Sequence, residues 1–338
     1  MPEAPRTSVA RKLRWGLLGT ARINRSLIPP LRLSPRNEPV AVASRDAERA
    51  AAFARTWDLP KAYGSYEDLL ADPDIDVVYV PLPNHLHVPW TLRAVAAGKH
   101  VLCEKPMALT PADVDAVARA ADEAGVVVAE AFMYRHHPRT RRIRELIAGG
   151  ALGELHLVRG AFTFVLDRPN DVRWRPEWGG GSLWDLGCYP VSFTRHVVGA
   201  EPEAVFAWQV LGPTGVDVSF TGQMRFPGDV LAVFDCGFRS RFRMEMAFVG
   251  RDGLLEAPRA FKPRPEEPMR RYGPDVDVPE PVLVDDPDDL YLGEVEDLAA
   301  AVLDGRPPEV TLAETRANTV VLEALLRSAR TGRPVRLS

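Results

Sequence analysis

Cysteine is scarce in this chain of 338 residues. Its three cysteines, Cys103, Cys188 and Cys236, are odd in number and form no CxxC pair. This excludes a disulfide framework and argues against a structural zinc site, which needs closely spaced ligands. Each cysteine is best interpreted as a small buried side chain. We therefore expect a protein of a reducing compartment, the cytoplasm.

Long apolar runs and an excess of one charge are also missing. The longest runs, such as VVVAEAFMY, are far shorter than the roughly 20 residues that cross a bilayer. No apolar h-region precedes the first expected strand, so we expect no secretory signal. The net charge of −4 does not suggest nucleic acid or an anionic membrane surface as a partner. The seven histidines form no ligand cluster, so we expect no metal.

Strand and helix patterns alternate in the first part of the chain. The expected strands cover 13–19, 39–45, 76–83, 99–106 and 125–131. The expected helices cover 47–57, 65–71, 86–97 and 111–124, and the last has a capping Thr110, Pro111 and a following Gly125. Pro29 and Pro30 predict a break or kink in the first helical stretch. Repeated strand–helix–strand units indicate an α/β fold, a Rossmann-type doubly wound parallel sheet.

The pattern of expected strands and helices changes after residue 135. A basic helix is expected over 138–148, two closing helices over 291–304 and 312–330, and strands over 153–167, 203–211, 217–226 and, as two strands, 229–249. With no helices between the later runs, they predict an α+β domain with a large, mainly antiparallel open sheet. The segment 257–290, rich in proline and acid, is expected to be an extended surface loop.

These patterns divide the chain into two domains. We expect a nucleotide-binding domain over 1–135 and a substrate-binding and oligomerisation domain over 136–338, with final helices that can pack back on the first domain. The open sheet needs a cover on its second face. We therefore expect a homodimer or homotetramer formed through that sheet.

A glycine motif ends the first strand. Gly16-x-x-Gly19-x-Ala21 is a displaced relative of G-x-G-x-x-G, in which small residues let a pyrophosphate approach a helix N-terminus. Glycines occur in many strand–helix turns, but this one lies at the first strand of a βαβ unit. The residues expected to contact the dinucleotide here are Gly16, Gly19, Thr20, Ala21, Arg22 and Ile23.

The end of the second strand bears on the cofactor type. An NAD site usually offers an acid to the ribose 2′-hydroxyl, but here Ser44 holds that position and Arg45 follows. A hydroxyl and a guanidinium suit a 2′-phosphate, so the sequence favours NADP over NAD. In the alternative interpretation, Arg45 is a surface residue and Asp46 only caps the next helix.

Two further strand ends carry polar residues. Pro83-Asn84-His85-Leu86-His87 follows the third long strand, where open α/β sheets bind ligands. His87 is expected to line the cofactor crevice or to pack under the following helix, with an H-x-H metal site as the weaker alternative. Lys105 follows Glu104 and precedes a proline, which holds it extended. It can stabilise negative charge on a substrate oxygen or simply pair with Glu104 in solvent.

The stretch GGGSLWDLGCYP at 179–190 places Asp185 and Tyr189 one helical turn apart. Together with GLLGTARI, ASRD, PLPNHLH, EKP and EAFMYRHHP, it is similar to the glucose–fructose oxidoreductase/inositol dehydrogenase (Gfo/Idh/MocA) family. The resemblance implies a Rossmann domain, a C-terminal domain with a large open sheet, and pyridine-nucleotide chemistry on sugars or related polyols. Many inositol dehydrogenase-type members carry histidine where Tyr189 stands. The tyrosine resembles the branch with dihydrodiol dehydrogenase and NADP-dependent xylose dehydrogenase.

The resemblance also implies roles for individual residues. Lys105, Asp185 and Tyr189 are the expected catalytic set: Tyr189 exchanges a proton with the substrate hydroxyl, Lys105 lowers its pKa, and Asp185 holds a neighbouring hydroxyl. Further residues expected to line the cofactor site are Leu82, Pro83, Asn84, His87, Glu104, Lys105 and Arg175. The residues expected around the substrate are Lys105, Arg135, His136, Asp185 and Tyr189, with Trp174, Trp178 and Trp184 as an apolar wall.

Three functions are compatible with these residues. The favoured one is an NADP-dependent oxidoreductase acting on a sugar or vicinal diol, and a keto-sugar or nucleotide-sugar ketoreductase fits the same residues. A hydrolase or lyase that uses NAD transiently would be favoured by an acid at position 44, which holds serine. A non-catalytic sensor would be expected to have lost Lys105 or Tyr189, and both are kept.

Overall fold

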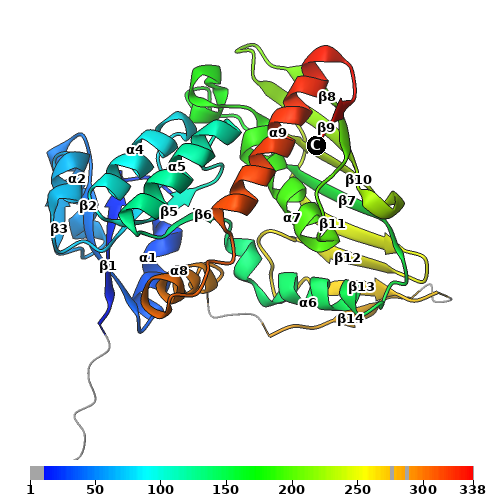
Figure 1. Ribbon diagram of the computed structural model, residues 1–338, viewed down its shortest axis with the longest axis horizontal. Helices are drawn as coiled ribbons and strands as arrows, with labels where there is room; N and C mark the ends of the chain where they lie inside the picture. Colours follow the sequence, from blue (N-terminus) through cyan, green and yellow to red (C-terminus); the bar gives the residue numbers. More distant parts are fainter. Residues whose placement is uncertain (1–10, 275–277, 286–288, 338) are drawn as a thin grey trace, which may run out of the picture.

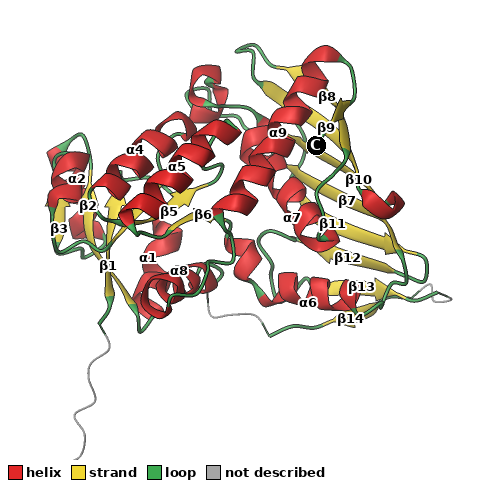
Figure 2. Ribbon diagram, viewed as in Figure 1, coloured by secondary structure: helices red, strands yellow, loops and turns green. Residues whose placement is uncertain are grey.

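Two β-sheets and the helices packed against them organise the computed structural model, which describes residues 11–274, 278–285 and 289–337. A smaller sheet forms with the first half of the chain and a larger one with the second half (Figure 1). The helices lie on the faces of the first sheet and between the two sheets (Figure 2). No helix in the described part of the chain has the length and apolar character needed to cross a membrane.

The first sheet is parallel, with strand order β3-β2-β1-β4-β5-β6. Its strands are β1 (Leu13–Leu18), β2 (Asn37–Ala43), β3 (Lys61–Tyr63), β4 (Val77–Val80), β5 (His100–Glu104) and β6 (Val128–Ala131). Its helices are α1 (Asn24–Leu33), α2 (Ala47–Thr56), α3 (Tyr66–Ala71), α4 (Asn84–Ala96) and α5 (Pro111–Ala124). The predicted doubly wound Rossmann sheet is confirmed. Its order reverses between β1 and β4, which is where such sheets bind ligands.

Local chemistry explains these elements. All of β4 is buried, as its unbroken apolar run predicts. Helix α5 begins where the Thr110 side chain accepts a hydrogen bond from the Asp113 amide, and it ends at Gly125, whose φ of 64° is the left-handed value of a helix C-terminus. Of the break or kink expected at Pro29 and Pro30, the break is wrong, because α1 continues through both prolines, and the kink stays a prediction.

The second sheet has nine strands in the order β14-β13-β12-β11-β7-β10-β9-β8-β15. Only the β7–β10 pair is parallel, so the predicted mainly antiparallel sheet is confirmed. The strands are β7 (Leu155–Thr163), β8 (Ala204–Leu211), β9 (Asp217–Arg225), β10 (Leu231–Gly237), β11 (Arg243–Gly250), β12 (Leu254–Pro258), β13 (Met269–Tyr272), β14 (Glu280–Val282) and β15 (Val335–Arg336).

The segment 257–290 departs from the expected surface loop. Its described parts include the end of β12 and all of β13 and β14, which extend the sheet at one edge. Proline is tolerated there because an edge strand leaves one row of N–H groups unpaired. Residues 275–277 and 286–288 of this segment lie outside the described residues.

Within the described residues, the second half of the chain contributes four α-helices, which pack on the large sheet or on the first domain. They are α6 (Pro138–Ala148), α7 (Cys188–Val198), α8 (Leu292–Asp304) and α9 (Leu312–Thr331). Helix α7 packs on β7 and β10, while α9 packs on β8 and also on α5. Helix α8 packs against α1 of the first domain. All three cysteines are buried and free, as predicted. We keep 1–135 and 136–338 as the proposed domains.

Candidate active site

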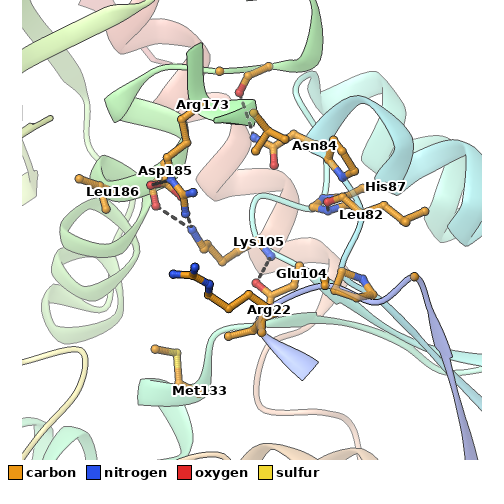
Figure 3. A pocket seen from close by; sticks show the side chains of 18 of the residues that line it. Arg22, Leu82, Asn84, His87, Glu104, Lys105, Met133, Arg173, Asp185 and Leu186 are labelled. Carbon is orange, nitrogen blue, oxygen red and sulfur yellow. Dashed lines mark hydrogen bonds and ion pairs between the residues drawn. The ribbon is translucent and has the colours of Figure 1, made fainter. Parts of the chain in front are cut away.

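A cavity of about 970 Å³ lies between the two domains, at the carboxyl ends of β1, β2, β4 and β5. Figure 3 shows how side chains from both domains converge in it. Its wall includes most of the residues that the sequence predicts for the site. Those from the first domain are Gly19, Thr20, Ala21, Arg22, Ile23, Ser44, Arg45, Leu82, Pro83, Asn84, His87, Glu104 and Lys105.

The turn after β1 is shaped for a close approach. Gly19 has φ of 95°, a conformation that L side chains rarely adopt. Its amide donates to the Ala43 carbonyl, and its own carbonyl accepts from Asn24 Nδ2, each at 2.8 Å. The chain then enters α1, whose first N–H groups are a natural site for a phosphate. Gly16 instead lies outside the cavity wall, and a Cβ there would lie 2.8 Å from Leu69 Cδ2, so it allows α3 to pack on β1.

The end of β2 presents cations without an acid. Ser44 and the exposed Arg45 line the cavity, together with Arg49 and Tyr66, which the sequence did not single out. The carboxylate of Asp46 accepts from the Arg49 amide at 3.1 Å, so it caps α2. The residues at this strand end therefore fit a phosphate group better than a neutral ribose hydroxyl.

The loop after β4 is fixed by buried polar contacts. His87 is 1% exposed, and its ring nitrogens lie 2.8 Å from the Pro106 carbonyl oxygen and 2.6 Å from that of Leu82. Burial lowers the pKa of His87 to about 4, although hydrogen bonds to the two carbonyl oxygens act in the opposite direction. A neutral ring has one N–H, so it donates to one of these two carbonyls, and that contact holds the loop. Asn84 donates from Nδ2 to the Gly179 carbonyl at 2.9 Å and so connects the two domains.

Lys105 and Asp185 form an ion pair across the domain boundary, visible as a dashed line in Figure 3. Lys105 Nζ donates to Asp185 Oδ1 at 3.1 Å and to the Asp185 backbone carbonyl at 2.7 Å. The other carboxylate oxygen, Oδ2, accepts from Arg173 Nε at 2.6 Å. Burial alone would raise the pKa of Asp185, but the charges of Lys105 and Arg173 lower it well below its usual value.

The charge on Lys105 is retained in this arrangement. Burial would lower the pKa of Lys105, but the Asp185 carboxylate outweighs that effect and raises it. Two of its three N–H groups point to Asp185 atoms. Within the part of the chain that the structure describes, the third N–H has no partner. Lys105 is therefore a charged donor with one N–H available at the cavity wall.

Tyr189 lies in an aromatic cluster at the cavity wall. Its ring is 5.2–5.9 Å from the rings of Phe132, Tyr134, Phe162 and Phe261. The Lys105 ammonium lies 5.0 Å from its ring centroid. Burial nevertheless raises the pKa of Tyr189 well above its usual value of 10. The net shift in the chain alone is upward, and the expected lowering of this pKa by Lys105 stays a prediction.

The glycine run before this helix serves chain packing. Gly181 has φ of 115°, and a Cβ there would lie 2.2 Å from Asp217 Oδ1. Asp217, from β9, accepts from Ser182 Oγ at 2.6 Å and from the Leu183 amide at 2.8 Å. It caps a π-helical turn, Leu183–Gly187, that carries Asp185 and leads directly into α7.

The structure places several predicted residues away from the cavity. Arg135 is 2% exposed and forms a two-point ion pair with Glu314. Arg175 is exposed and lies over the ring of Trp178. Trp174 packs on Phe238 instead of the cavity wall. Two further predicted pocket residues are also absent from the wall, His136 and Trp184, whereas Trp178 lines it.

Sequence reasoning missed a second group of wall residues. Arg173 is the arginine of the R-W-R stretch that reaches the site, because a short 3₁₀ turn places it, not Arg175, against Asp185. Segment 259–264, within the expected surface loop, contributes Arg259, Lys262 and Arg264 to the wall. A pair of basic residues around Pro263 was the available signal, but no motif marked it.

Two family models match the chain. The model described as "oxidoreductase family, NAD-binding Rossmann fold" matches residues 13–132, and the model described as "GFO/IDH/MocA C-terminal domain" matches residues 140–256. Between them they cover the first sheet, strands β7 to β11 of the second sheet, and Lys105, Asp185 and Tyr189.

Known proteins of similar sequence and structure extend over most of the chain. D-xylose 1-dehydrogenase (NADP(+)) 2 of Haloferax volcanii is 40% identical over 96% of this chain and 99% of its own length. Trans-1,2-dihydrobenzene-1,2-diol dehydrogenase of Sus scrofa is 38% identical over 72% of this chain and 73% of its own. The crystal structure of a 3-ketoreductase from Actinomadura kijaniata, in complex with NADP and TDP-benzene, has a TM-score of 0.88 and 30% identity over 94% of this chain and 98% of its own.

Proposed function

Because the chain belongs to the GFO/IDH/MocA family of oxidoreductases, we propose that it transfers a hydride between NADP and the CH–OH or ketone carbon of a sugar or vicinal diol. The observation that carries this proposal is the meeting of Lys105 from one domain with Asp185 and Tyr189 from the other at one cavity. The similar xylose and diol dehydrogenases support the substrate class.

In this reaction, residues of the chain exchange the substrate proton and stabilise the charge that develops on the substrate oxygen. A bound nicotinamide supplies or accepts the hydride. The available N–H of Lys105 and the phenol of Tyr189 can both approach one substrate oxygen, where Lys105 stabilises developing negative charge and Tyr189 exchanges the proton. Asp185 keeps Lys105 charged and in place. Arg173 holds Asp185 from its other side.

The direction of carbonyl reduction has specific support. A phenol whose pKa lies at or above 10 is protonated at neutral pH, as a proton donor to a ketone oxygen must be. The structurally similar 3-ketoreductase agrees with this direction. For oxidation of an alcohol, the same phenol must first lose its proton, and it can do so only once substrate and cofactor have changed its surroundings.

A turnover assay with a matched pair of tyrosine variants tests the proposal. Nicotinamide absorbance is followed with NADP or NADPH and a panel of aldoses, diols and keto-sugars. We expect Tyr189→Phe to lower kcat by about 100- to 10,000-fold. Tyr134→Phe is the control, because its phenol belongs to the same aromatic cluster but donates to Ser192 Oγ at 2.9 Å.

Two results would overturn the assignment. Equal turnover by wild type and Tyr189→Phe would remove Tyr189 from the proton step. No turnover with any sugar, diol or keto-sugar would shift weight to the cofactor-assisted hydrolase or the non-catalytic sensor.

Selectivity for NADP is a separate part of the proposal. It is supported by Ser44 and Arg45 at the end of β2 and by Arg49 in the first turn of α2, with Asp46 engaged in capping α2. We expect Arg45→Gln to weaken NADP binding by about tenfold, since a charge-assisted contact is worth roughly 1.5–3 kcal/mol, and to leave NAD binding unchanged. Arg55→Gln, on the exposed last turn of α2, is the control. Equal losses for both cofactors would contradict a 2′-phosphate site.

We also propose that two or four copies assemble through the large sheet. Helices cover one of its faces, while Trp208 and Leu231 on the other are 64% and 51% exposed. This face is hollowed beside Phe206 and Val233. Large apolar side chains that are this exposed are typical of an interface. Sedimentation should therefore give a dimer or tetramer, and Trp208→Arg should weaken it; a strictly monomeric wild type would refute the proposal.

A cytoplasmic location completes the proposal. It is supported by three cysteines that are all free, which fits a reducing compartment. Cell fractionation tests it, and recovery in an exported fraction would contradict it.

A further inference from the structure

Cations outnumber carboxylates along the wall of the cavity between the domains, although the chain as a whole carries a net charge of −4. Lysine is rare in this protein, with five in the sequence, yet two of the five line this cavity. The acids at the wall are Glu104 and Asp185, and the cations are Arg22, Arg45, Arg49, Lys105, Arg173, Arg259, Lys262 and Arg264.

Most of these cations have a partner or an assigned task. The three arginines from the turns after β1 and β2 are available to the phosphates of a dinucleotide. Lys105 and Arg173 share Asp185, and Arg259 pairs with Glu267. Lys262 and Arg264 remain. Within residues 11–274, 278–285 and 289–337, neither side chain has an ion pair or a hydrogen bond.

The segment that carries these two cations is held firmly against the site. Phe261, next to Lys262, is fully buried, with its ring 5.2 Å from that of Tyr189. The guanidinium of Arg139 donates to the backbone carbonyl of Arg264 and, at 2.8 Å, to that of Glu267. The backbone on both sides of Pro263 is therefore fixed by buried contacts that reach the proton donor itself.

The two lysines at the cavity influence each other. Lys262 is exposed to solvent at the cavity wall, and its pKa is lowered by partial desolvation and then by the positive charge of Lys105, against the opposing charges of Glu104 and Asp185. Their like charges therefore act on one another across the cavity, and an anion bound there would relieve the repulsion. A phosphate ester carries a charge of about −1.5 to −2 at pH 7, close to the sum of two cations, whereas a carboxylate carries one. The charge balance thus favours phosphate.

We propose that Lys262 and Arg264 form a subsite for a phosphate group of the substrate, so that the enzyme prefers a phosphorylated sugar to a neutral one. This rests on the proposed function, because it places the phosphate in the same cavity as Tyr189. A sugar monophosphate and a nucleotide diphosphate sugar share the chemistry that these cations recognise.

A binding experiment tests the subsite without turnover. Inorganic phosphate is titrated by calorimetry into protein saturated with NADP, so that the cofactor's phosphate contacts are already filled. We expect the double variant Lys262→Gln/Arg264→Gln to bind phosphate at least about tenfold more weakly than wild type. Arg251→Gln is the control, since it removes one exposed charge from the β11–β12 turn. A double variant that binds phosphate as tightly as this control overturns the proposal.

A kinetic experiment then identifies the source of the phosphate. The value of kcat/KM is compared for a neutral aldose, its monophosphate and a nucleotide diphosphate sugar. We expect the double variant to lose about tenfold or more on one phosphorylated class, through KM, and nothing on the neutral sugar. An equal loss on the neutral sugar overturns the proposal, because it indicates a structural effect.

The two proposals fail in distinguishable ways. If no sugar of any class is turned over, the proposed oxidoreductase activity fails, while the phosphate titration still decides the subsite. Tyr189→Phe should abolish turnover and keep the wild-type affinity for phosphate. A loss of phosphate binding in both Tyr189→Phe and the double variant would contradict a subsite made by the two cations.

Discussion

Asp185→Asn is the substitution that tests the centre of the site most directly. The carboxylate receives Lys105 Nζ at 3.1 Å on one oxygen and Arg173 Nε at 2.6 Å on the other. Asparagine keeps the size and one acceptor oxygen but removes the charge. Burial lowers the pKa of Lys105, and the Asp185 charge is the main effect that opposes this. Without that charge, the pKa of Lys105 must fall from its raised value.

The same change should destabilise the fold. Breaking a buried ion pair by removing one partner costs about 3–5 kcal/mol. The side chains of Lys105 and Asp185 are 12% and 13% exposed, but that of Arg173 is 32% exposed and solvent screens its share. We therefore expect the low end, about 3 kcal/mol, which lowers the melting temperature by several degrees in a protein of this size.

The small number of lysines makes the pKa measurable. Reductive methylation with ¹³C-formaldehyde gives one dimethyl-lysine signal for each of the five lysines, and Lys105→Arg assigns the one of interest. We expect that signal to titrate at lower pH in Asp185→Asn than in wild type. Asp171→Asn is the matched control, since Asp171 accepts from Arg173 at 3.1 Å and makes no contact with Lys105. Equal titration midpoints in wild type and Asp185→Asn would refute the reasoning.

Three further changes probe the framework of the site. Asp217→Asn should cost about 1–3 kcal/mol of stability by weakening two buried hydrogen bonds, and thermal melts should show no such loss for Asp229→Asn, whose side chain is 94% exposed. Gly181→Ala should lower the melting temperature because its φ is 115° and the added Cβ meets a carboxylate. Burial, with nearby arginines, lowers the pKa of His136 to about 3. The unfolded imidazole, with a pKa of 6.5, therefore takes up protons first, and about 1 kcal/mol of stability should be lost between pH 7.5 and 5.5. In urea melts, that pH dependence should shrink in His136→Gln and persist in His156→Gln, a change on the exposed side of β7.

The chemistry of the site was largely predictable because strand ends determine it. In a parallel sheet the carboxyl ends of all strands meet at one edge, so residues that follow β1, β2, β4 and β5 had to meet as well. Lys105 and Gly19 were placed correctly at the cavity for that reason. The spacing of Asp185 and Tyr189 likewise predicted one face of a helix, although the turn between them is π-helical.

Sequence-based predictions are wrong where a partner that is distant in sequence determines the environment of a residue. Arg135 lies at the end of the first domain, where the sequence predicts a pocket residue. Its guanidinium instead pairs with the carboxylate of Glu314 on α9, which is 179 residues away in sequence. No local sequence pattern predicts such a partner. The abundance of proline and acid predicts a loop over 257–290, yet Pro281 occupies an edge strand that tolerates it.

The glycine run 179–181 allows two chain segments to approach each other closely. A Cβ at Gly180 would lie 2.5 Å from the Arg173 carbonyl oxygen. The amide of Gly181 donates to that same carbonyl at 3.1 Å. Glycine is therefore required so that the 3₁₀ turn carrying Arg173 can lie against the start of the π-helical turn carrying Asp185. That close approach allows the 2.6 Å contact between Arg173 and Asp185. The glycines thus act on the chemistry through chain packing, because they allow the contact that holds the carboxylate facing Lys105.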